Sequence, residues 1–289
     1  MDAFVTRHKR PPPARKTARE AKREEEGEAI SKDAFHALCN LFEAMRIEVE
    51  AVKDTPDVEV ELEVRVGSLV VEDGGDGPRR RRYVPGVSQG RFRFLLEWLE
   101  QSAAAGLDAR SPWRETCASY FQTTAADKED RSRKTTLRQT ATRSKDEKKL
   151  VRKTVLKQVI LETNHPEGVA FKFTLSLEEG LHDDWHDVCG ASEVEIVRLR
   201  HRKQFLTTTA RNVVSFDFTI VWTAANERLA KEKQRCGRDT RYEIEMEVVD
   251  AAGFVASHAS AAGMARSVAS KVASLYEREM VATKPLSFF

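Results

Sequence analysis

The chain has 289 residues, enough to bury a full hydrophobic core as one large domain or two small ones. Charged residues make up 33 % of it, but the two signs nearly cancel to a net charge of +2, which excludes a global attraction to nucleic acid. No apolar run approaches the roughly 20 residues that a membrane-spanning helix needs, so we expect a soluble protein without a membrane partner.

The four cysteines lie far apart, at Cys39, Cys117, Cys189 and Cys236. They form no Cys-x-x-Cys pair and have no histidine at the spacing of a zinc site. Widely separated thiols are typical of reduced cysteines, so the sequence predicts an intracellular protein.

Residues 1–30 hold many charges and three consecutive prolines but almost nothing to bury. This composition predicts a disordered basic tail ahead of one folded domain at 31–289. The basic cluster at 7–10, followed by Lys16 and Arg19, has the composition of a nuclear-localisation signal, which predicts the nucleus as location; a solvated charged tail explains it equally well. Ser31 then caps a predicted helix whose apolar residues recur at helical spacing: Phe35, Leu38, Leu41, Phe42 and Met45.

The stretch at 58–67 alternates apolar and charged residues with period two, which predicts a strand. Its charged face carries Glu59, Glu61, Glu63 and Arg65. Neighbouring like charges on a sheet repel, so a solvated face would more often mix Glu with Lys, Thr or Ser. A bound cation would remove this repulsion. Gly67 closes the run, where a small residue lets chains approach closely.

The segment at 72–89 is rich in Gly and Arg and predicts a mobile loop. Its four arginines at 79–82 are interpreted as a solubilising surface, with contact to RNA phosphates as the alternative. A helix is predicted from about Gly90, with Phe94, Leu95, Trp98 and Leu99 as its buried stripe.

From Trp113 onward the sequence predicts consecutive strands joined by polar loops. The first shared polar face consists of Thr136, Arg138, Thr140 and Thr142. The next strand places on one side Lys149, Val151, Lys153, Val155 and Lys157. In the strand at 169–178, the face opposite the apolar residues carries Lys172, Thr174, Ser176 and Glu178.

A basic strand follows at 197–205, with Arg198, Arg200 and Arg202 on one face. His201 falls on the other face, so we interpret it as packed or on the surface and not as a metal ligand. The next strand sets Asp217 among small polar residues, opposite an apolar face.

A second acidic strand at 241–250 places Glu243, Glu245 and Glu247 on one face. A helix at about 254–280 is expected to pack beneath the sheet. The two acidic strands would be neighbours if the sheet closed into a barrel, and their carboxylates would then meet around one metal.

The polar faces segregate by sign from strand to strand, whereas solvent-exposed faces would mix signs. If all of them line one lumen, the carboxylates bind a hard divalent cation such as Mg²⁺ or Mn²⁺, and Arg and Lys hold a polyanion. This inventory predicts metal-assisted phosphoryl transfer to water. For any single strand, a plain solvent face remains the simpler interpretation.

The residues at 61–67, Glu-Leu-Glu-Val-Arg-Val-Gly, resemble the first signature strand of the metal-dependent RNA 5′-triphosphatases of the triphosphate tunnel metalloenzyme superfamily. The strands at 242–247, 198–202 and 216–219 resemble their closing acidic strand, their basic strand and the strand after it, and the order agrees over about 35–280. The resemblance implies an α+β, mainly β fold: an eight-stranded antiparallel β-tunnel with a hydrophilic lumen, flanked by helices.

The resemblance also implies roles for individual side chains. Glu61, Glu63, Glu245 and Glu247 would hold Mg²⁺ or Mn²⁺, with Glu243 assisting. Arg138, Arg200 and Arg202 would hold the terminal phosphate, and Lys153 and Lys172 would also bind substrate. Arg198 and Asp217 would brace side chains inside the tunnel, and Glu178 would position the attacking water.

Two departures from the family pattern bear on substrate preference. Arg65 stands where members often have Lys, and Arg200 stands where fungal enzymes tend to have Lys. Both keep the positive charge, but a guanidinium is a planar fork and an ammonium a point charge.

The function implied is hydrolysis of the γ-phosphate of triphosphate-ended RNA, the first step of mRNA 5′ capping, with NTP as a side substrate. One alternative is a hydrolase of inorganic or thiamine triphosphate from the same superfamily. Another is a non-catalytic barrel that binds RNA or a partner. The chain carries no Lys-x-Asp-Gly guanylyltransferase motif, so the rest of capping is expected to belong to another chain or domain; docking on a separate guanylyltransferase and a homodimer are both left open.

Overall fold

The computed structural model describes residues 32–72, 80–104, 109–121, 134–142, 145–163, 169–181, 194–209 and 212–283. The predicted basic tail, Ser31, Cys189 and Arg79 lie outside these residues. No helix in the described part of the chain is both long and apolar enough to cross a membrane.

Ten strands of the described residues form one antiparallel sheet. They are β1 Val58–Glu72, β2 Arg80–Pro85, β3 Ala109–Arg110, β4 Arg114–Phe121, β5 Lys134–Thr142, β6 Lys145–Glu162, β7 Val169–Leu181, β8 Val194–Thr209, β9 Asn212–Ala224 and β10 Arg241–Val248. The order is β10-β9-β8-β4-β5-β6-β7-β1-β2, with β3 beside β8. An additional β1–β10 pairing closes eight strands into a barrel, which confirms the predicted fold.

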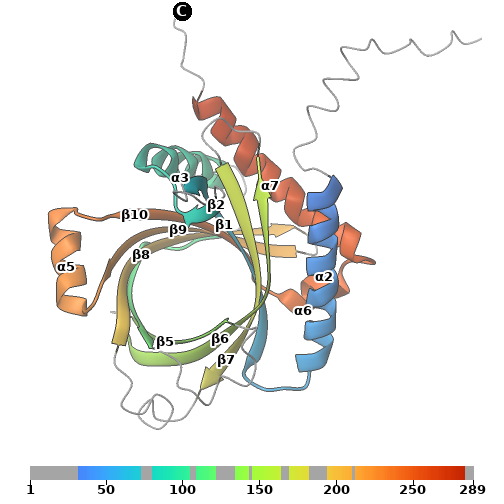
Figure 1. The fold of residues 1–289 in the computed structure, drawn as a ribbon, viewed down its shortest axis with the longest axis horizontal. Coiled ribbons are helices and arrows are strands. Elements are labelled where there is room, and N and C mark those ends of the chain that lie inside the picture. The colour runs from blue at the N-terminus through green and yellow to red at the C-terminus, as the bar shows by residue number, and fades with distance from the viewer. Residues whose placement is uncertain are drawn as a thin grey trace, which may run out of the picture.

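Helices of the described chain cover the outside of the barrel (Figure 1). They are α2 Lys32–Val52, α3 Gln89–Ala104, α5 Glu227–Cys236, α6 Ala251–Ala256 and α7 Ala261–Thr283. Figure 1 shows α2, α6 and α7 along one side of the ring and α5 on the opposite side.

The hydrophobic core lies between the outer faces of the strands and these helices. Leu38 and Phe42 of α2 are fully buried, as are Phe173 and Leu175 of β7. The rings of Phe42 and Phe254 are 6.1 Å apart, so α2 also packs on α6. Burying each such side chain contributes about 1.5–3 kcal/mol relative to exposing it. The apolar faces therefore point outward, and the polar faces are left for the lumen.

Three predictions about elements are wrong. The Gly- and Arg-rich segment is not all loop: β1 continues to Glu72, and residues 80–85 form β2, which pairs with β1. The C-terminal helix is two helices, because the side chain of Ser260 accepts a hydrogen bond from the Gly263 N–H and starts a second helix. In addition to these three errors, the helix α5 was not predicted at all.

The third error concerns the face of β6. A bulge shifts the register between Val155 and Lys157, so Leu156 is an extra residue in the strand. Lys157 therefore lies outside, where its ammonium donates to the carbonyl of Asn40 on α2. Residues before the bulge keep the predicted face, and Lys153 lines the lumen.

Candidate active site

Strand register brings the two acidic faces together. Glu63 of β1 lies opposite Glu247 of β10, and Arg65 lies opposite Glu245. On its other side, β1 places Glu61 opposite Ser176 of β7. Because residues two apart share a face, these side chains all point into the barrel. The predicted neighbourhood of the acidic strands is confirmed.

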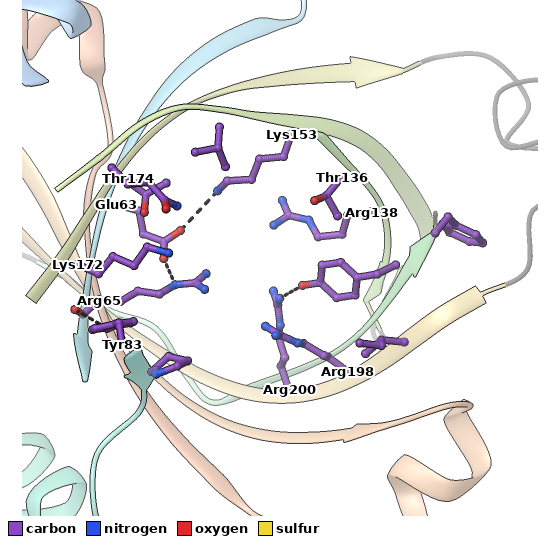
Figure 2. A pocket seen from close by; sticks show the side chains of 16 residues that line it. Glu63, Arg65, Tyr83, Thr136, Arg138, Lys153, Lys172, Thr174, Arg198 and Arg200 are labelled. Carbon is purple, nitrogen blue, oxygen red and sulfur yellow. Dashed lines mark hydrogen bonds and ion pairs between the residues drawn. The ribbon is translucent and has the colours of Figure 1, made fainter. Parts of the chain in front are cut away.

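The lumen consists of two adjoining cavities. One has a volume of about 420 Å³ and is lined by most of the carboxylates, among them Glu59, Glu61, Glu178, Glu245 and Glu247; we call it the acidic half. The other, the basic half, has a volume of about 560 Å³ and is shown in Figure 2. Both are lined by Glu63, Arg65, Arg138, Lys153 and Arg200, which therefore stand where the two halves meet.

Lys153 is the centre of one charge cluster. Its ammonium pairs with Glu61, lies 3.2 Å from an oxygen of Glu178 and 3.5 Å from one of Glu63. The Ser176 hydroxyl donates to Glu61 over 3.0 Å. Burial lowers the pKa of Lys153, but the three carboxylates outweigh it, so the pKa is raised and the side chain stays charged.

Arg65 is the centre of a second cluster. Its Nε atom bonds to Glu63, as Figure 2 shows, and lies 2.8 Å from Glu245. Burial raises the pKa of Glu245, but Arg65 and Arg202 outweigh burial and hold it well below the ordinary range. The guanidinium of Arg65, which lies between β1 and β10, thus offsets the repulsion between the two acidic faces.

Glu178 is held from two sides. One nitrogen of Arg138 lies 3.1 and 3.2 Å from its two oxygens, and Lys153 lies on the other side. Burial raises the pKa of Glu178, but Arg138 and Lys153 outweigh this and lower it. The carboxylate is therefore ionised and oriented, and it lines the acidic half.

The three arginines of β8 project into the lumen as predicted. Arg200 donates to the hydroxyl of Tyr120 on β4, and the guanidinium of Arg198 lies 5.3 Å from the centre of the same ring. Burial lowers the pKa of Arg200, and the positive charges of Arg202 and Arg138 act in the same direction. Within the described chain, the buried Nε atoms of Arg138 and Arg200 have no hydrogen-bond partner. Convergent guanidinium donors of this kind suit an anion.

Arg202 pairs with Asp217 over 2.9 Å and lies 3.7 Å from Glu245. Asp217 is 1 % exposed, and burial raises its pKa against the effect of Arg202. It is not among the described residues that line either half of the lumen. The structure thus places Asp217 behind Arg202, where it can orient that guanidinium.

The remaining predicted residues differ in their positions. Lys172 lines the basic half, with its ammonium 5.8 Å from the centre of the Tyr83 ring. Glu243 is buried and 3.7 Å from Arg241, but among the described residues it does not line either half. Two tyrosines of the lumen, Tyr83 and Tyr120, were not predicted, although Tyr120 shares the alternating polar face of β4 with Thr116.

A divalent metal fits the chemistry of the acidic half. Burial, with the charges of Glu61 and Asp217, raises the pKa of Glu247 to about 8, so carboxylates crowd each other at this wall. Carboxylate oxygens are the ligands that hard cations prefer. In the described chain, however, no three carboxylate, His or Cys side chains are arranged as a metal site, because Lys153 and Arg65 stand between the carboxylates.

His201 stacks on Trp113, with ring centres 4.6 Å apart. The prediction that His201 is packed or on the surface is confirmed.

Comparisons with solved structures identify chains of the same architecture. The structure of the S. pombe RNA triphosphatase Pct1 is similar with a TM-score of 0.60 and 15 % identity, over 86 % of this chain and 93 % of that one. Pct1 in complex with the Spt5 CTD gives a TM-score of 0.58 and 16 % identity, over 86 % and 94 %. The Mimivirus capping enzyme triphosphatase, at 10 % identity over 87 % and 99 %, reaches a TM-score of only 0.49.

No protein-family model matches the chain, and a search of curated proteins found no match. The likeness to Pct1 covers most of this chain and nearly the whole of that one. The chain therefore has the tunnel fold of the fungal RNA triphosphatase Pct1, which confirms at the level of the fold the resemblance seen in its sequence.

Proposed function

We propose that the chain hydrolyses the γ-phosphate of triphosphate-ended RNA to leave diphosphate-ended RNA, the first step of mRNA 5′ capping. The observation that carries the proposal is Glu178, which lines the acidic half and is held by Arg138 and Lys153, two of the cations that stand where the two halves meet. The fold shared with Pct1, an RNA triphosphatase, supports the same substrate class.

The described side chains divide the work of phosphoryl transfer. Arg138, Arg200 and Arg202 would hold the terminal phosphate, with the buried Nε atoms of the first two as donors. Lys153 would add charge at the same point. Glu178, ionised and fixed at both oxygens, would accept a hydrogen bond from the attacking water and aim it at phosphorus. A loose transition state needs positioning and charge compensation more than a strong base.

Glu61, Glu63, Glu245 and Glu247 would hold Mg²⁺ or Mn²⁺, with Glu243 assisting from its buried position beside them. When bound, the ion would neutralise charge on the phosphate oxygens. Binding would require the carboxylates to exchange contacts with Lys153 and Arg65 for contacts with the ion, and both cations would then be available to the phosphates.

Product analysis tests this proposal against its alternatives. RNA labelled in its β-phosphate, inorganic tripolyphosphate and thiamine triphosphate would be compared at equal concentration with Mn²⁺. The proposal requires diphosphate-ended RNA and free orthophosphate, with RNA preferred to tripolyphosphate and thiamine triphosphate. Preference for one of the small substrates would transfer the assignment to a small-triphosphate hydrolase. RNA binding without any product would indicate a binding barrel.

A further inference from the structure

The basic half of the lumen carries two pairs of a tyrosine and a cation. In one pair, Lys172 lies 5.8 Å from the ring centre of Tyr83; in the other, Arg198 lies 5.3 Å from that of Tyr120. In the closed ring β7 and β8 lie four strands apart, so Lys172 faces Arg198 across the lumen. Tyr83 lies on β2, which pairs with β1 next to β7, and Tyr120 lies on β4 next to β8. Figure 2 shows Lys172 and Tyr83 on one wall and Arg198 on the opposite wall.

Both rings are fixed by their hydroxyl groups. The Tyr83 hydroxyl donates to the carbonyl of Arg65 over 2.9 Å, and the Tyr120 hydroxyl accepts from Arg200. Gly67 makes room for Tyr83, since a Cβ there would lie 2.6 Å from the end of the ring. The rings are therefore tied to the charged network at one end while both line the cavity.

The two halves of the lumen differ in what they can bind. The acidic half is lined by charged and polar side chains alone, without an apolar or aromatic residue among those described. The basic half adds four apolar residues to the two tyrosines: Pro85, Phe121, Val155 and Ile196. A base stacks on aromatic faces and packs on apolar side chains, so only the basic half offers a surface for one.

The charged residues that line the two halves also favour the basic half as the place where the RNA binds. Six basic side chains face a single carboxylate in the described lining of the basic half. The acidic half sets six carboxylates against seven basic side chains, and its wall continues past Glu59, Glu178 and Glu247 into a groove beside α6. A polyanionic chain is therefore attracted more strongly to the basic half, where the excess of positive charge is larger.

We propose that the nucleoside next to the triphosphate binds in the basic half, with its base against the ring of Tyr120 and the following phosphate between Lys172 and Arg198. The inference rests on the proposed function and adds the orientation of the RNA in the lumen. The RNA chain extends from the reacting phosphate into the basic half, and most of the carboxylates lie on the other side of that phosphate. A cavity of about 560 Å³ is within the usual range for a ligand of this size.

Two ligands isolate the nucleoside: β,γ-imido ATP, which carries one, and inorganic tripolyphosphate, which does not. Calorimetry in the Glu178→Gln background with Mg²⁺ measures both affinities without turnover. Tyr120→Leu removes the ring and is expected to weaken imido-ATP about tenfold more than tripolyphosphate. Tyr120→Phe keeps the ring but loses the contact with Arg200, so it is expected to change both affinities by the same factor.

A second variant leaves Tyr120 in place, so its result does not depend on whether the protein folds without that side chain. Ile196→Trp fills the basic half and is expected to weaken imido-ATP at least fivefold while leaving tripolyphosphate unchanged. Equal effects on both ligands in Tyr120→Leu and Ile196→Trp would overturn the nucleoside site. The two claims fail separately: selective loss of imido-ATP binding supports the site even if no triphosphate is hydrolysed, and hydrolysis with equal effects supports only the proposed function.

Discussion

Glu178 and Glu179 are neighbours on β7 that face opposite sides of the barrel. Glu178 contacts Arg138 and Lys153 in the lumen, whereas Glu179 pairs with Arg152 over 2.9 Å. Glu178→Gln keeps the size of the side chain but removes the charge that orients the water. We expect kcat for γ-phosphate release to fall at least 100-fold with little change in KM. Steady-state kinetics on triphosphate-ended RNA measures this.

Glu179→Gln is the matched control for that variant, because it makes the same chemical change one residue away on the outer face. Its kcat should stay within about twofold of the wild type. Equal losses in the two variants would mean that the strand, and not the lumen carboxylate, is the sensitive feature.

Arg200 is buried in the lumen and Arg138 is half-buried there, and the two should affect stability differently. Glu178 raises the pKa of Arg138 against burial, whereas burial lowers that of Arg200, beside two other guanidinium groups. Arg138→Met should lower the free energy of unfolding by about 1–3 kcal/mol, since it removes an ion-pair partner from the half-buried carboxylate of Glu178. Arg200→Met should leave it unchanged or raise it by about 1 kcal/mol.

Urea unfolding of both variants decides the point. Both should lose activity, because both arginines belong to the proposed phosphate site. A larger loss of stability in Arg200→Met than in Arg138→Met would contradict this account of the lumen charges.

The sequence predicted most lumen side chains because alternation assigns each one to a face. It did not predict their partners. The bridge from Arg65 to Glu245 depends on the register of β1 against β10, which are far apart in sequence, and the contact of Arg200 with Tyr120 depends on the register of β8 against β4. Tyr120 itself was missed because one aromatic residue on a mixed strand carries no signal of a lumen.

At the scale of elements, the pairing of β1 with β2 depends on Gly67. A Cβ there would lie 2.4 Å from the carbonyl oxygen of Val84 and 2.6 Å from the Tyr83 ring. Gly67→Ala should therefore push β2 away and destabilise the fold by about 1–3 kcal/mol, measured by urea unfolding.

Gly90, near the start of α3, is the matched control, since nothing lies within 4 Å of a Cβ added there. Gly90→Ala should be neutral or stabilise by roughly 0.5–1 kcal/mol, because alanine loses less backbone entropy in a helix. Equal destabilisation by both substitutions would show that close approach at Gly67 is not the cause.

The elements that escaped prediction have identifiable physical reasons. The strand β2 is short and rich in Arg, so its sequence lacks the apolar alternation that predicts a strand. Two of its arginines form exposed ion pairs, Arg81 with Glu162 and Arg82 with Glu72. The helix α5 is mostly charged, but Asn226 caps its start and Gly237, with φ 63°, ends it. Those two residues are the signal by which it is predictable. The bulge in β6 has no such signal.

At the scale of the whole molecule, closure of the barrel joins the first and last long strands and creates the acidic wall. Alternation predicts the strands but not their order around the ring; the resemblance implied only that eight strands close into a tunnel. Because the wall concentrates like charges, a divalent ion that binds there should stabilise the folded state.

Thermal unfolding tests that expectation. With Mg²⁺ or Mn²⁺ at 100 times its Kd, the gain is about 2.7 kcal/mol, which raises Tm by several degrees. Glu61→Gln should lose most of this shift, whereas Glu179→Gln should retain it. Chelator should return the wild type to its metal-free Tm. A shift that persists in Glu61→Gln would contradict a metal site on this wall.

The measurement that tests the central claim most directly is release of γ-phosphate from triphosphate-ended RNA by the wild type, Glu61→Ala and Glu179→Ala, each with Mn²⁺ and with chelator. We expect release by the wild type and by Glu179→Ala that requires metal, and a loss of at least 100-fold in Glu61→Ala. Release that is indifferent to chelator and to Glu61→Ala, or no release from folded wild-type protein with any divalent ion, would contradict the tunnel mechanism.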